Sequence, residues 1–377
     1  MSLFISSGEA SGDHYTANIA RALRRNGYSG EIWGMGGLEA RNAGINALWK
    51  GERLQLLGLT EVFSAIPSIF SLLRDMSGRI MEASPDAVIV CDSPDFHMRL
   101  IARLRKIGYK GNIFYISPPS VWAWRSGRAD ALRENNCICL PLFKFEHEFL
   151  LSRGCVSKWI GHPFVEEFKQ DDTESDKIKS LFDTTRLVAF LPGSRGSEIK
   201  ALLPFLLKSA DVLAQKGFQP VFSVATGLNP VVREKMLSQF KNDGVLFYDG
   251  SGRSLMANSL CAVGASGTIT VEALLLGCYM VVTYKLNPIT AFAARCIIRI
   301  KHYAMANILA GCEMFPELLQ NRATVENITS NALNWLNGSS DFRDNIKSIM
   351  KNAKLTLGED GVYDFWCRNI LSKTGII

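Results

Sequence analysis

Residues Val188–Ile199 combine an apolar run, a glycine-rich loop and one arginine, and the pattern then continues as a helix. Gly193 and Gly196 would let backbone amides approach an anion, the helix start would add partial positive charge, and Arg195 would donate a planar fork of N–H groups. These are the parts of a phosphate site. The loop matches neither the lysine-containing P-loop nor the G-x-G-x-x-G fingerprint, and a tight strand-to-helix turn would also recruit glycine. Both interpretations stay open for this loop taken alone.

A second loop of the same kind lies in the same half of the chain. The segment Gly264–Glu272 again leads from an apolar run into a helix, and Ser266, Gly267 and Thr268 would expose backbone amides at that helix start. Two loops suited to anions in one half-chain indicate a diphosphate and the sugar attached to it.

The elements that would position these loops alternate between strand and helix. The predicted strands are Leu3–Ser6, Glu31–Gly34, Pro85–Cys91, Asn112–Ile116, Leu187–Leu191, Pro220–Ala225, Val245–Tyr248, Cys261–Gly264 and Tyr279–Tyr284, and the main predicted helices are His14–Asn26, His97–Lys106, Leu203–Gln215 and Thr270–Leu276. Such alternation predicts parallel sheets covered on both faces, with ligands at the carboxyl ends of the strands. The loops Gly8–Asp13, Asp92–Asp95 and Ser117–Arg125 should therefore share one rim.

Length and composition predict a globular protein of two domains. The chain has 377 residues, of which 47% are hydrophobic and 21% charged, and this is long for a single core. The polar, acid-rich stretch Glu166–Thr185 suggests the boundary. We expect a first domain over residues 1–168, a second over 186–350, and a C-terminal segment, 351–377, that packs back on the first.

Charge and cysteine usage narrow the class of protein. A net charge of +6 favours an anionic partner, but no Lys/Arg run resembles a nucleic-acid arm. The nine cysteines have no paired C-x-x-C spacing, which is typical of reduced core residues in a cytosolic protein, and the histidines lack metal-ligand spacing. No stretch reaches the roughly 20 apolar residues needed to span a bilayer, so the protein is expected to be soluble or to lie on a membrane surface.

Six segments taken in order closely resemble the lipid-A-disaccharide synthase family. They are Gly8–Asp13, Asp92–Phe96, Ser117–Arg125, Ile160–Pro163, Leu191–Glu198 and Ala306–Gly311. The resemblance implies a GT-B glycosyltransferase with two doubly wound, Rossmann-like α/β domains facing across a cleft. One departure is an added proline in Ser117–Trp122, which leaves the acyl-chain preference open.

The resemblance also implies the reaction and its partners. The family joins UDP-2,3-diacylglucosamine to 2,3-diacylglucosamine 1-phosphate in a β(1→6) link, releases UDP and inverts the anomeric centre. It needs no cofactor and no metal. The expected location is the cytoplasmic side of the inner membrane, with the protein peripheral on its surface, and a homo-oligomer stays open.

An inverting transferase needs a base beside the acceptor hydroxyl, and Asp92 and Asp95 are the candidates. Ser93 is expected to cap a helix with Pro94 at its first position, so that Asp95 is a first-turn acid favoured by the helix dipole. Asp92 ends the strand before it, where capping alone does not explain a carboxylate. We therefore predict that Asp92 is the catalytic base, the alternative being a second cap.

The remaining site residues divide between the two substrates. Glu9, Ser11 and Asp13 are assigned to the acceptor side, although a helix N-cap would equally explain Ser11 or Asp13. The donor side is predicted to comprise the diphosphate loops, a ribose-binding glutamate and one residue assigned by resemblance alone. These residues are Gly193, Ser194, Arg195, Ser266, Gly267, Thr268, Glu272 and Asn307. Trp122 and Trp124 are interpreted as core residues.

Two other classes of function compete with this prediction. Another GT-B UDP-sugar enzyme, such as a UDP-GlcNAc transferase or a 2-epimerase, would carry similar glycine-rich loops. A non-catalytic nucleotide-sugar-binding protein would retain Arg195 and Glu272 but would not need Asp92.

The apolar segment Leu54–Leu73 favours a lipid substrate and a membrane-docking surface over a buried helix pair. The large apolar residues that carry this interpretation are Leu56, Leu57, Leu59, Val62, Phe63, Ile66, Ile69, Phe70, Leu72 and Leu73. A basic helix at Thr290–Lys301 would add attraction to anionic lipid.

Overall fold

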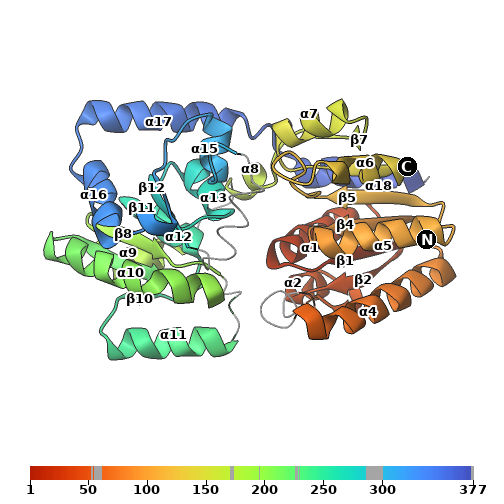
Figure 1. Ribbon diagram of the computed structural model, residues 1–377, viewed down its shortest axis with the longest axis horizontal. Helices are drawn as coiled ribbons and strands as arrows, with labels where there is room; N and C mark the ends of the chain where they lie inside the picture. Colours follow the sequence, from red (N-terminus) through yellow and green to blue (C-terminus); the bar gives the residue numbers. More distant parts are fainter. Residues whose placement is uncertain are drawn as a thin grey trace. The chain divides into compact units, whose positions relative to one another are not determined.

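The computed structural model describes residues 1–51, 54, 62–169, 174–194, 196–225, 228, 230–285 and 300–374. The chain divides into two compact units (Figure 1): unit 1 comprises Met1–Glu166 and Leu357–Ile377, and unit 2 comprises Glu167–Thr356. The expected C-terminal segment beginning at residue 351 is wrong in its start, because a helix of unit 2, α17 (Ser340–Leu355), continues past that position.

Within its described residues, unit 1 is a seven-stranded parallel sheet in the order β3-β2-β1-β4-β5-β6-β7. Its strands are β1 (Ser2–Ser7), β2 (Glu31–Gly36), β3 (Asn46–Lys50), β4 (Ala87–Cys91), β5 (Asn112–Ile116), β6 (Cys137–Leu140) and β7 (Val156–Ser157). Its helices are α1 (Ala10–Arg25), α2 (Leu38–Asn42), α4 (Val62–Ala83), α5 (Pro94–Lys106), α6 (Gly127–Glu134), α7 (Lys144–Ser152), α8 (Phe164–Glu167, which spans the boundary) and α18 (Val362–Thr374). The strand order reverses between β1 and β4, and ligands collect at such a switch point.

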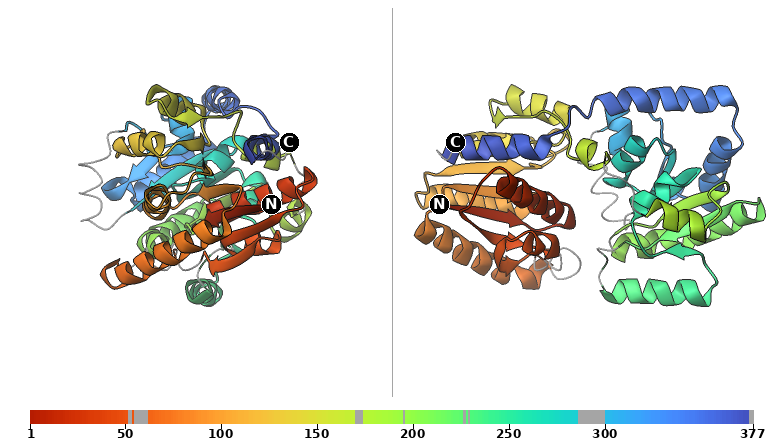
Figure 2. Two further views of the ribbon diagram at one scale, coloured as in Figure 1. Left: turned by 90° about the vertical axis from the view of Figure 1, so that its right-hand side faces the viewer. Right: turned by 180° about the vertical axis from the view of Figure 1, so that it is seen from behind.

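The central strands of unit 1 are buried on both faces, as parallel strands with crossover helices require. All five residues of β4 are buried. Phe4, Val88 and Tyr115 pack into one cluster with side chains of α4, α5 and α6. Figure 1 shows α5 in front of this sheet, and the view from behind in Figure 2 shows α1 and α18 on the other face.

The C-terminal helix α18 completes unit 1 by packing along α1. Asn18 Nδ2 donates to the Tyr363 hydroxyl at 3.2 Å, and the rings of Tyr15 and Trp366 lie 6.3 Å apart, edge to face. The last helix of the chain is thus part of the same core as its first strand.

Within its described residues, unit 2 holds a six-stranded parallel sheet in the order β10-β9-β8-β11-β12-β13. Its strands are β8 (Leu187–Leu191), β9 (Gln219–Ser223), β10 (Phe247–Tyr248), β11 (Cys261–Ala265), β12 (Met280–Tyr284) and β13 (Glu317–Leu319). Its helices are α9 (Ser175–Leu181), α10 (Gly196–Gln215), α11 (Pro230–Asn242), α12 (Gly252–Ala257), α13 (Ile269–Leu276), α15 (Met305–Ala310), the short 3-10 helix η1 (Gln320–Arg322), α16 (Val325–Leu336) and α17. The switch point here lies between β8 and β11.

The predicted α/β class with two parallel sheets is confirmed, and the differences lie at the ends of elements and at the sheet edges. The first helix begins at Ala10, so the expected loop Gly8–Asp13 is mostly helical. Four strands were not predicted: β3, β6, β7 and β13. They have two to five residues each, which gives little periodicity to detect.

The described part of the chain contains no helix long and apolar enough to cross a membrane. Its eight cysteines form no disulfide, and all of them except Cys312 are buried. The expected basic helix at Thr290–Lys301 lies outside the described residues except at its last two positions.

Candidate active site

In unit 1 the side chain of Asp92 joins the two loops at the switch point. β1 and β4 are neighbours in register, with Ser7 opposite Cys91, so the loops that follow them start side by side. The Asp92 carboxylate accepts hydrogen bonds from the backbone amides of Gly8 and Glu9, both at 3.2 Å. Asp92 therefore lies at the carboxyl edge of the sheet, as the sequence predicts.

Buried side chains hold the backbone of Asp92 through hydrogen bonds to its carbonyl oxygen. Its carbonyl accepts a hydrogen bond from the Tyr115 hydroxyl and one from His97 Nδ1, each at 2.8 Å. Since a carbonyl only accepts, Nδ1 carries the proton, and His97 Nε2 accepts from the Ser6 hydroxyl at 2.8 Å. Burial lowers the pKa of His97 to about 4, so the ring is uncharged at neutral pH. It positions the Asp92 backbone and is not an acid in the reaction.

The environment of Asp92 suits a general base. Burial raises the pKa of its carboxyl to about 7, hydrogen bonds from Ser93 and the two amides oppose the rise, and the charge of Glu9 adds to it. A base whose pKa lies near the working pH transfers protons most effectively. The neighbouring Gly12 must lack a side chain, because a Cβ there would lie 1.7 Å from Asp92 Oδ2.

Backbone strain is concentrated around this edge. Seven non-glycine residues in the described part of the chain have positive φ, and four of them follow β4 and β5: Asp92, Ser93, Ser117 and Arg125. Such conformations cost about 1–3 kcal/mol each and gather at functional sites. The strain supports the location of the site independently of its charges.

The prediction that the Ser93 side chain caps the helix is wrong. Ser93 occupies the N-cap position of α5 and Pro94 follows it as expected, but the Ser93 backbone is left-handed and its side chain bonds no helix amide. It hydrogen-bonds to Asp92 instead. Asp95 does lie in the first turn, and its largely exposed carboxylate pairs with the guanidinium groups of Arg125 and Arg128.

The three acceptor-side residues have different environments. Glu9 is the N-cap residue of α1, and Ser11 is exposed in its first turn. Asp13 is buried, and its carboxylate accepts from the amides of Gly37 at 2.6 Å and Glu39 at 2.9 Å. Asp13 therefore caps α2, which packs beside α1, and this structural role accounts for its carboxylate.

In unit 2 the two glycine-rich loops lie at neighbouring strand ends. Leu191 at the end of β8 pairs with Gly264 of β11. Gly193 has a φ of +110°, and a Cβ there would lie 3.3 Å from the Cβ of Ala265, so the first loop passes close to the end of β11. Ser194 is exposed beside it, and Arg195 lies outside the described residues.

The second loop leads into α13 as predicted. Ser266 is partly buried, Gly267 has a φ of +155°, and Thr268 is the N-cap residue without a side-chain cap. Glu272 lies in the first turn and is partly buried. The amino ends of α10 and α13 thus begin beside each other, an arrangement suited to a diphosphate.

The Asn307 side chain, predicted on the donor side, lies in the core of unit 2. Its side chain is fully buried, its Nδ2 donates to the Phe315 carbonyl at 2.7 Å and to Glu317 Oε1 at 2.8 Å, and its Oδ1 accepts from the Phe315 amide at 2.9 Å. Both amide hydrogens are used within unit 2. Asn307 therefore anchors α15 to β13.

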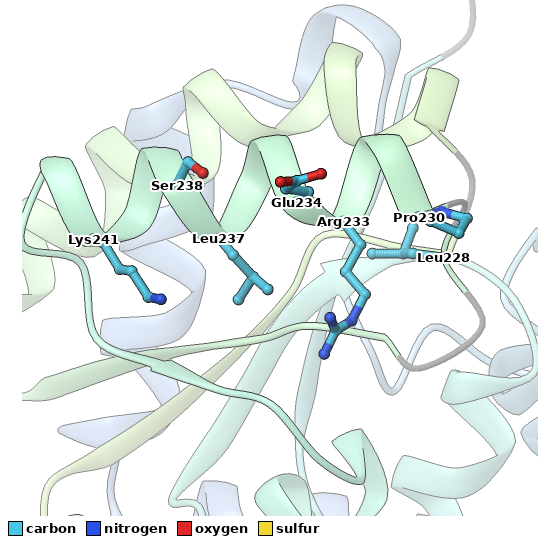
Figure 3. A pocket seen from close by; sticks show the side chains of 7 residues that line it. All are labelled: Leu228, Pro230, Arg233, Glu234, Leu237, Ser238 and Lys241. Atoms are coloured by element: carbon cyan, nitrogen blue, oxygen red, sulfur yellow. The ribbon is translucent and has the colours of Figure 1, made fainter.

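A hollow of about 570 Å³ also runs along α11 in unit 2 (Figure 3). The lining residues are Leu228, Pro230, Arg233, Glu234, Leu237, Ser238 and Lys241. Figure 3 shows Arg233 pointing away from the helix, and its guanidinium pairs with Asp249. None of the predicted site residues lines this hollow, so we do not assign the reaction to it.

Sequence reasoning missed several residues around Asp92. The hydrogen bonds of His97 and Tyr115 to Asp92 could not be predicted, because a buried histidine or tyrosine looks like any core residue in a sequence. Trp124 is not simply a core residue: it is partly buried, and Arg125 Cζ lies 4.3 Å from its ring centroid. No group of three or more His, Cys, Asp and Glu side chains is placed to hold a metal ion in the part of the chain that the structure describes.

Comparison with known proteins gives a consistent result. The model of the lipid-A-disaccharide synthetase family matches residues 3–361. A lipid-A-disaccharide synthase from Anaeromyxobacter dehalogenans is 35% identical over 362 residues, which is 95% of this chain and 94% of the relative. One from Azotobacter vinelandii is 36% identical over 326 residues, or 85% of each chain.

Solved structures share the fold at low identity. A putative UDP-N-acetylglucosamine 2-epimerase from Listeria monocytogenes has a TM-score of 0.67 at 14% identity, over 98% of this chain and 94% of its own. The UDP-GlcNAc 2-epimerase from Neisseria meningitidis bound to UDP-GlcNAc has a TM-score of 0.66 at 12% identity, over 99% and 100%. At this identity the likeness shows the fold alone, which is that of GT-B proteins.

Proposed function

Because this chain belongs to the lipid-A-disaccharide synthase family, we propose which substrate each of its two units binds in the glycosyl transfer that makes the lipid A disaccharide. The chain is a glycosyltransferase with the GT-B fold. In our proposal unit 2 binds UDP-2,3-diacylglucosamine and unit 1 binds 2,3-diacylglucosamine 1-phosphate. The location of Asp92 at the switch point of unit 1 is the observation that carries this division.

Asp92 is the proposed general base. It takes the proton of the acceptor 6-hydroxyl as that oxygen attacks the anomeric carbon of the donor. The bond from this carbon to the UDP oxygen breaks on the opposite face, and UDP leaves with the electron pair. The result is an inverted, β(1→6)-linked disaccharide, with the proton on the Asp92 carboxyl.

The donor side rests on unit 2. Ser194 and Arg195 in the first loop and Ser266, Gly267 and Thr268 in the second are proposed to hold the diphosphate, since both loops open helices at adjacent strand ends. Glu272 is proposed to accept hydrogen bonds from the ribose hydroxyls. Its first-turn location and partial burial support this role.

Mass spectrometry of the products tests the proposal. The protein is incubated with UDP-2,3-diacylglucosamine and 2,3-diacylglucosamine 1-phosphate, and we expect the tetraacyl disaccharide 1-phosphate and UDP. An epimerised UDP-sugar made without acceptor would indicate a 2-epimerase. UDP-sugar binding without any product would indicate a binding protein.

The pH dependence of turnover reports on the base. Only the ionised Asp92 carboxylate accepts a proton, and burial raises the pKa of this group to about 7. We therefore expect kcat/KM to fall about tenfold per pH unit below pH 7 and to level off above about pH 8. UDP affinity measured over the same range is the control. A kcat/KM that stays flat down to pH 5 would contradict a base with this pKa.

We further propose that the protein docks on the cytoplasmic face of the inner membrane through the start of α4. Leu72 and Leu73 are core residues, whereas Phe70 is 54% exposed and Arg99 Cζ lies 5.9 Å from its ring centroid. Arg74 and Arg99 are exposed on the adjoining helices α4 and α5 and would attract anionic lipid. The described side chains of the predicted apolar segment thus include both core and surface positions. Positions 55–61 and the side chains at 62–66, that of Phe63 included, lie outside the described part.

Replacing Phe63 and Phe70 together by Ser should reduce binding to anionic liposomes severalfold, because a partitioning aromatic side chain is lost at each position. Cosedimentation measures the effect. Phe342→Ser is the matched control, since Phe342 is 38% exposed on α17 of unit 2. Unchanged liposome binding would contradict the docking surface, and an unfolded double variant would show that these side chains belong to the core.

A further inference from the structure

Two guanidinium groups share one carboxylate next to Asp92. Arg125 Nη1 donates to Asp95 Oδ1 at 3.2 Å, and Arg128 Nη2 donates to the same oxygen. The indole of Trp124 lies against both cations, with its ring centroid 4.3 Å from Arg125 Cζ and 5.4 Å from Arg128 Cζ. We call Trp124, Arg125, Arg128 and Asp95 the arginine cluster.

The arginine cluster keeps a net positive charge and unused donors. One carboxylate neutralises one of the two cations. Each guanidinium has five N–H groups in a fixed fork, and a single bond to Asp95 leaves most of them available to a planar or tetrahedral anion. The Arg125 side chain is 54% exposed and that of Arg128 is 15% exposed, so one cation faces solvent and the other is held within the fold.

The arginine cluster is built into the same edge as Asp92. Asp95 lies three residues after Asp92 at the start of α5, and Arg125 has a strained backbone with a φ of +50°. Burial raises the pKa of the Tyr115 hydroxyl, the charge of Asp92 adds to the rise, and the charge of Arg128 opposes it. The same hydroxyl donates to the Asp92 carbonyl at 2.8 Å.

We propose that Arg125 and Arg128 bind the phosphate monoester of the acceptor sugar, with Trp124 fixing the planes of their guanidinium groups. This rests on the proposed function, which supplies a phosphorylated sugar to the unit that carries Asp92. The phosphate accepts from the donors that Asp95 leaves unused and orients the sugar so that its far hydroxyl approaches the base. A sugar without the phosphate loses this orientation.

The experiment compares two acceptors, 2,3-diacylglucosamine 1-phosphate and the same sugar without phosphate, in wild type and variants. Arg125→Ala should lower kcat/KM for the phosphorylated acceptor by about 10- to 150-fold, the range for a charge-assisted hydrogen bond, and change it less than about twofold for the other. Arg128→Lys keeps the charge but loses the fork, so it should lose part of the same preference. Arg133→Ala on α6 is the control with an equal change of charge, and its phosphate preference should match the wild type.

Binding measurements make the outcome independent of turnover. Titration of wild type with glucosamine 1-phosphate should show binding that Arg125→Ala weakens by a similar factor, with unchanged UDP affinity and melting temperature. Equal affinity in both proteins would overturn the proposal and leave the cluster as a surface ion pair. If the wild type makes no disaccharide but binds glucosamine 1-phosphate through Arg125, the proposed function fails and the phosphate site stands.

Membrane lipid headgroups are the other source of a phosphate for the arginine cluster. Vesicle binding distinguishes them from the phosphorylated acceptor sugar. Vesicles of phosphatidylcholine with and without phosphatidylglycerol should bind wild type and Arg125→Ala equally. If Arg125→Ala loses binding to the anionic vesicles while its preference for the phosphorylated acceptor persists, the cluster recognises lipid headgroups and the proposal is wrong.

Discussion

Asp92→Asn should lower kcat by about two to four powers of ten while UDP affinity stays close to that of the wild type. The asparagine has the shape of the aspartate but cannot take the acceptor proton. Its amide would also face one of the two N–H donors, Gly8 or Glu9, that the carboxylate now accepts from. A moderate loss of thermal stability is therefore expected, and single-turnover kinetics should be measured well below the melting temperature.

Asp95→Asn is the matched control for Asp92→Asn, with the same chemical change three residues along the chain. Whereas the Asp92 carboxyl is partly buried and has a raised pKa, Asp95 is exposed and its carboxylate is already paired with two arginines. Its loss should lower the melting temperature slightly and leave most of the turnover. If Asp95→Asn were the inactive protein and Asp92→Asn kept near-normal kcat, the two roles would have to be exchanged.

Arg195→Ala should weaken UDP binding by about 1.5 to 3 kcal/mol, or roughly 10- to 150-fold, because it removes a charge-assisted hydrogen bond to the diphosphate. The described residues on either side support this: Gly193 adopts a φ of +110° against Ala265, and α10 starts at Gly196. Isothermal titration calorimetry with UDP measures the effect.

Arg186→Ala provides the control for Arg195→Ala. Arg186 directly precedes β8 and pairs with Asp183, whereas the loop with Arg195 follows β8, so the two arginines flank opposite ends of one strand. The control should keep wild-type UDP affinity. Unchanged affinity in a folded Arg195→Ala protein would show that backbone amides alone hold the diphosphate.

The sequence predicted the elements of the two sheets well where strands were buried on both faces. β4 and β8 are continuous apolar runs of five residues between polar loops, a pattern typical of a central parallel strand and too short for a buried helix. In the edge strand β3 three exposed positions alternate with the partly buried Ala47 and the buried Trp49, and β7 has only two residues. Such strands form because the neighbouring strands β2 and β6 offer hydrogen bonds, and the segment's own residues carry too little pattern to predict that pairing.

For the site, the sequence could predict that the loops follow strand ends, but not which groups their side chains contact. Asp13 has the spacing of an N-cap, yet it caps α2, because β1 and β2 are neighbours and bring the two helix starts together. Asn307 was assigned by resemblance, and only the fold reveals that Glu317 and Phe315 use its amide group. The location of Asp92 and of the two loops of unit 2 at strand ends could be predicted, because the end of a buried parallel strand fixes the location of the residue that follows.

Because α18 returns to unit 1, that unit is a host domain, and unit 2 is a guest domain inserted near the end of the host's sequence. The chain leaves unit 1 after Glu166 and re-enters it at Leu357, and the two crossings are tied together: the His162 amide donates to the Leu357 carbonyl at 2.8 Å, and the Glu359 amide donates to the Ile160 carbonyl at 2.9 Å. A guest domain whose two connections lie side by side can be exchanged for the corresponding part of a relative without cutting the host's sheet. Removal of the last twenty residues, in contrast, would strip a helix from the host and leave the guest whole, so a truncated protein should lose acceptor chemistry before it loses the ability to bind UDP.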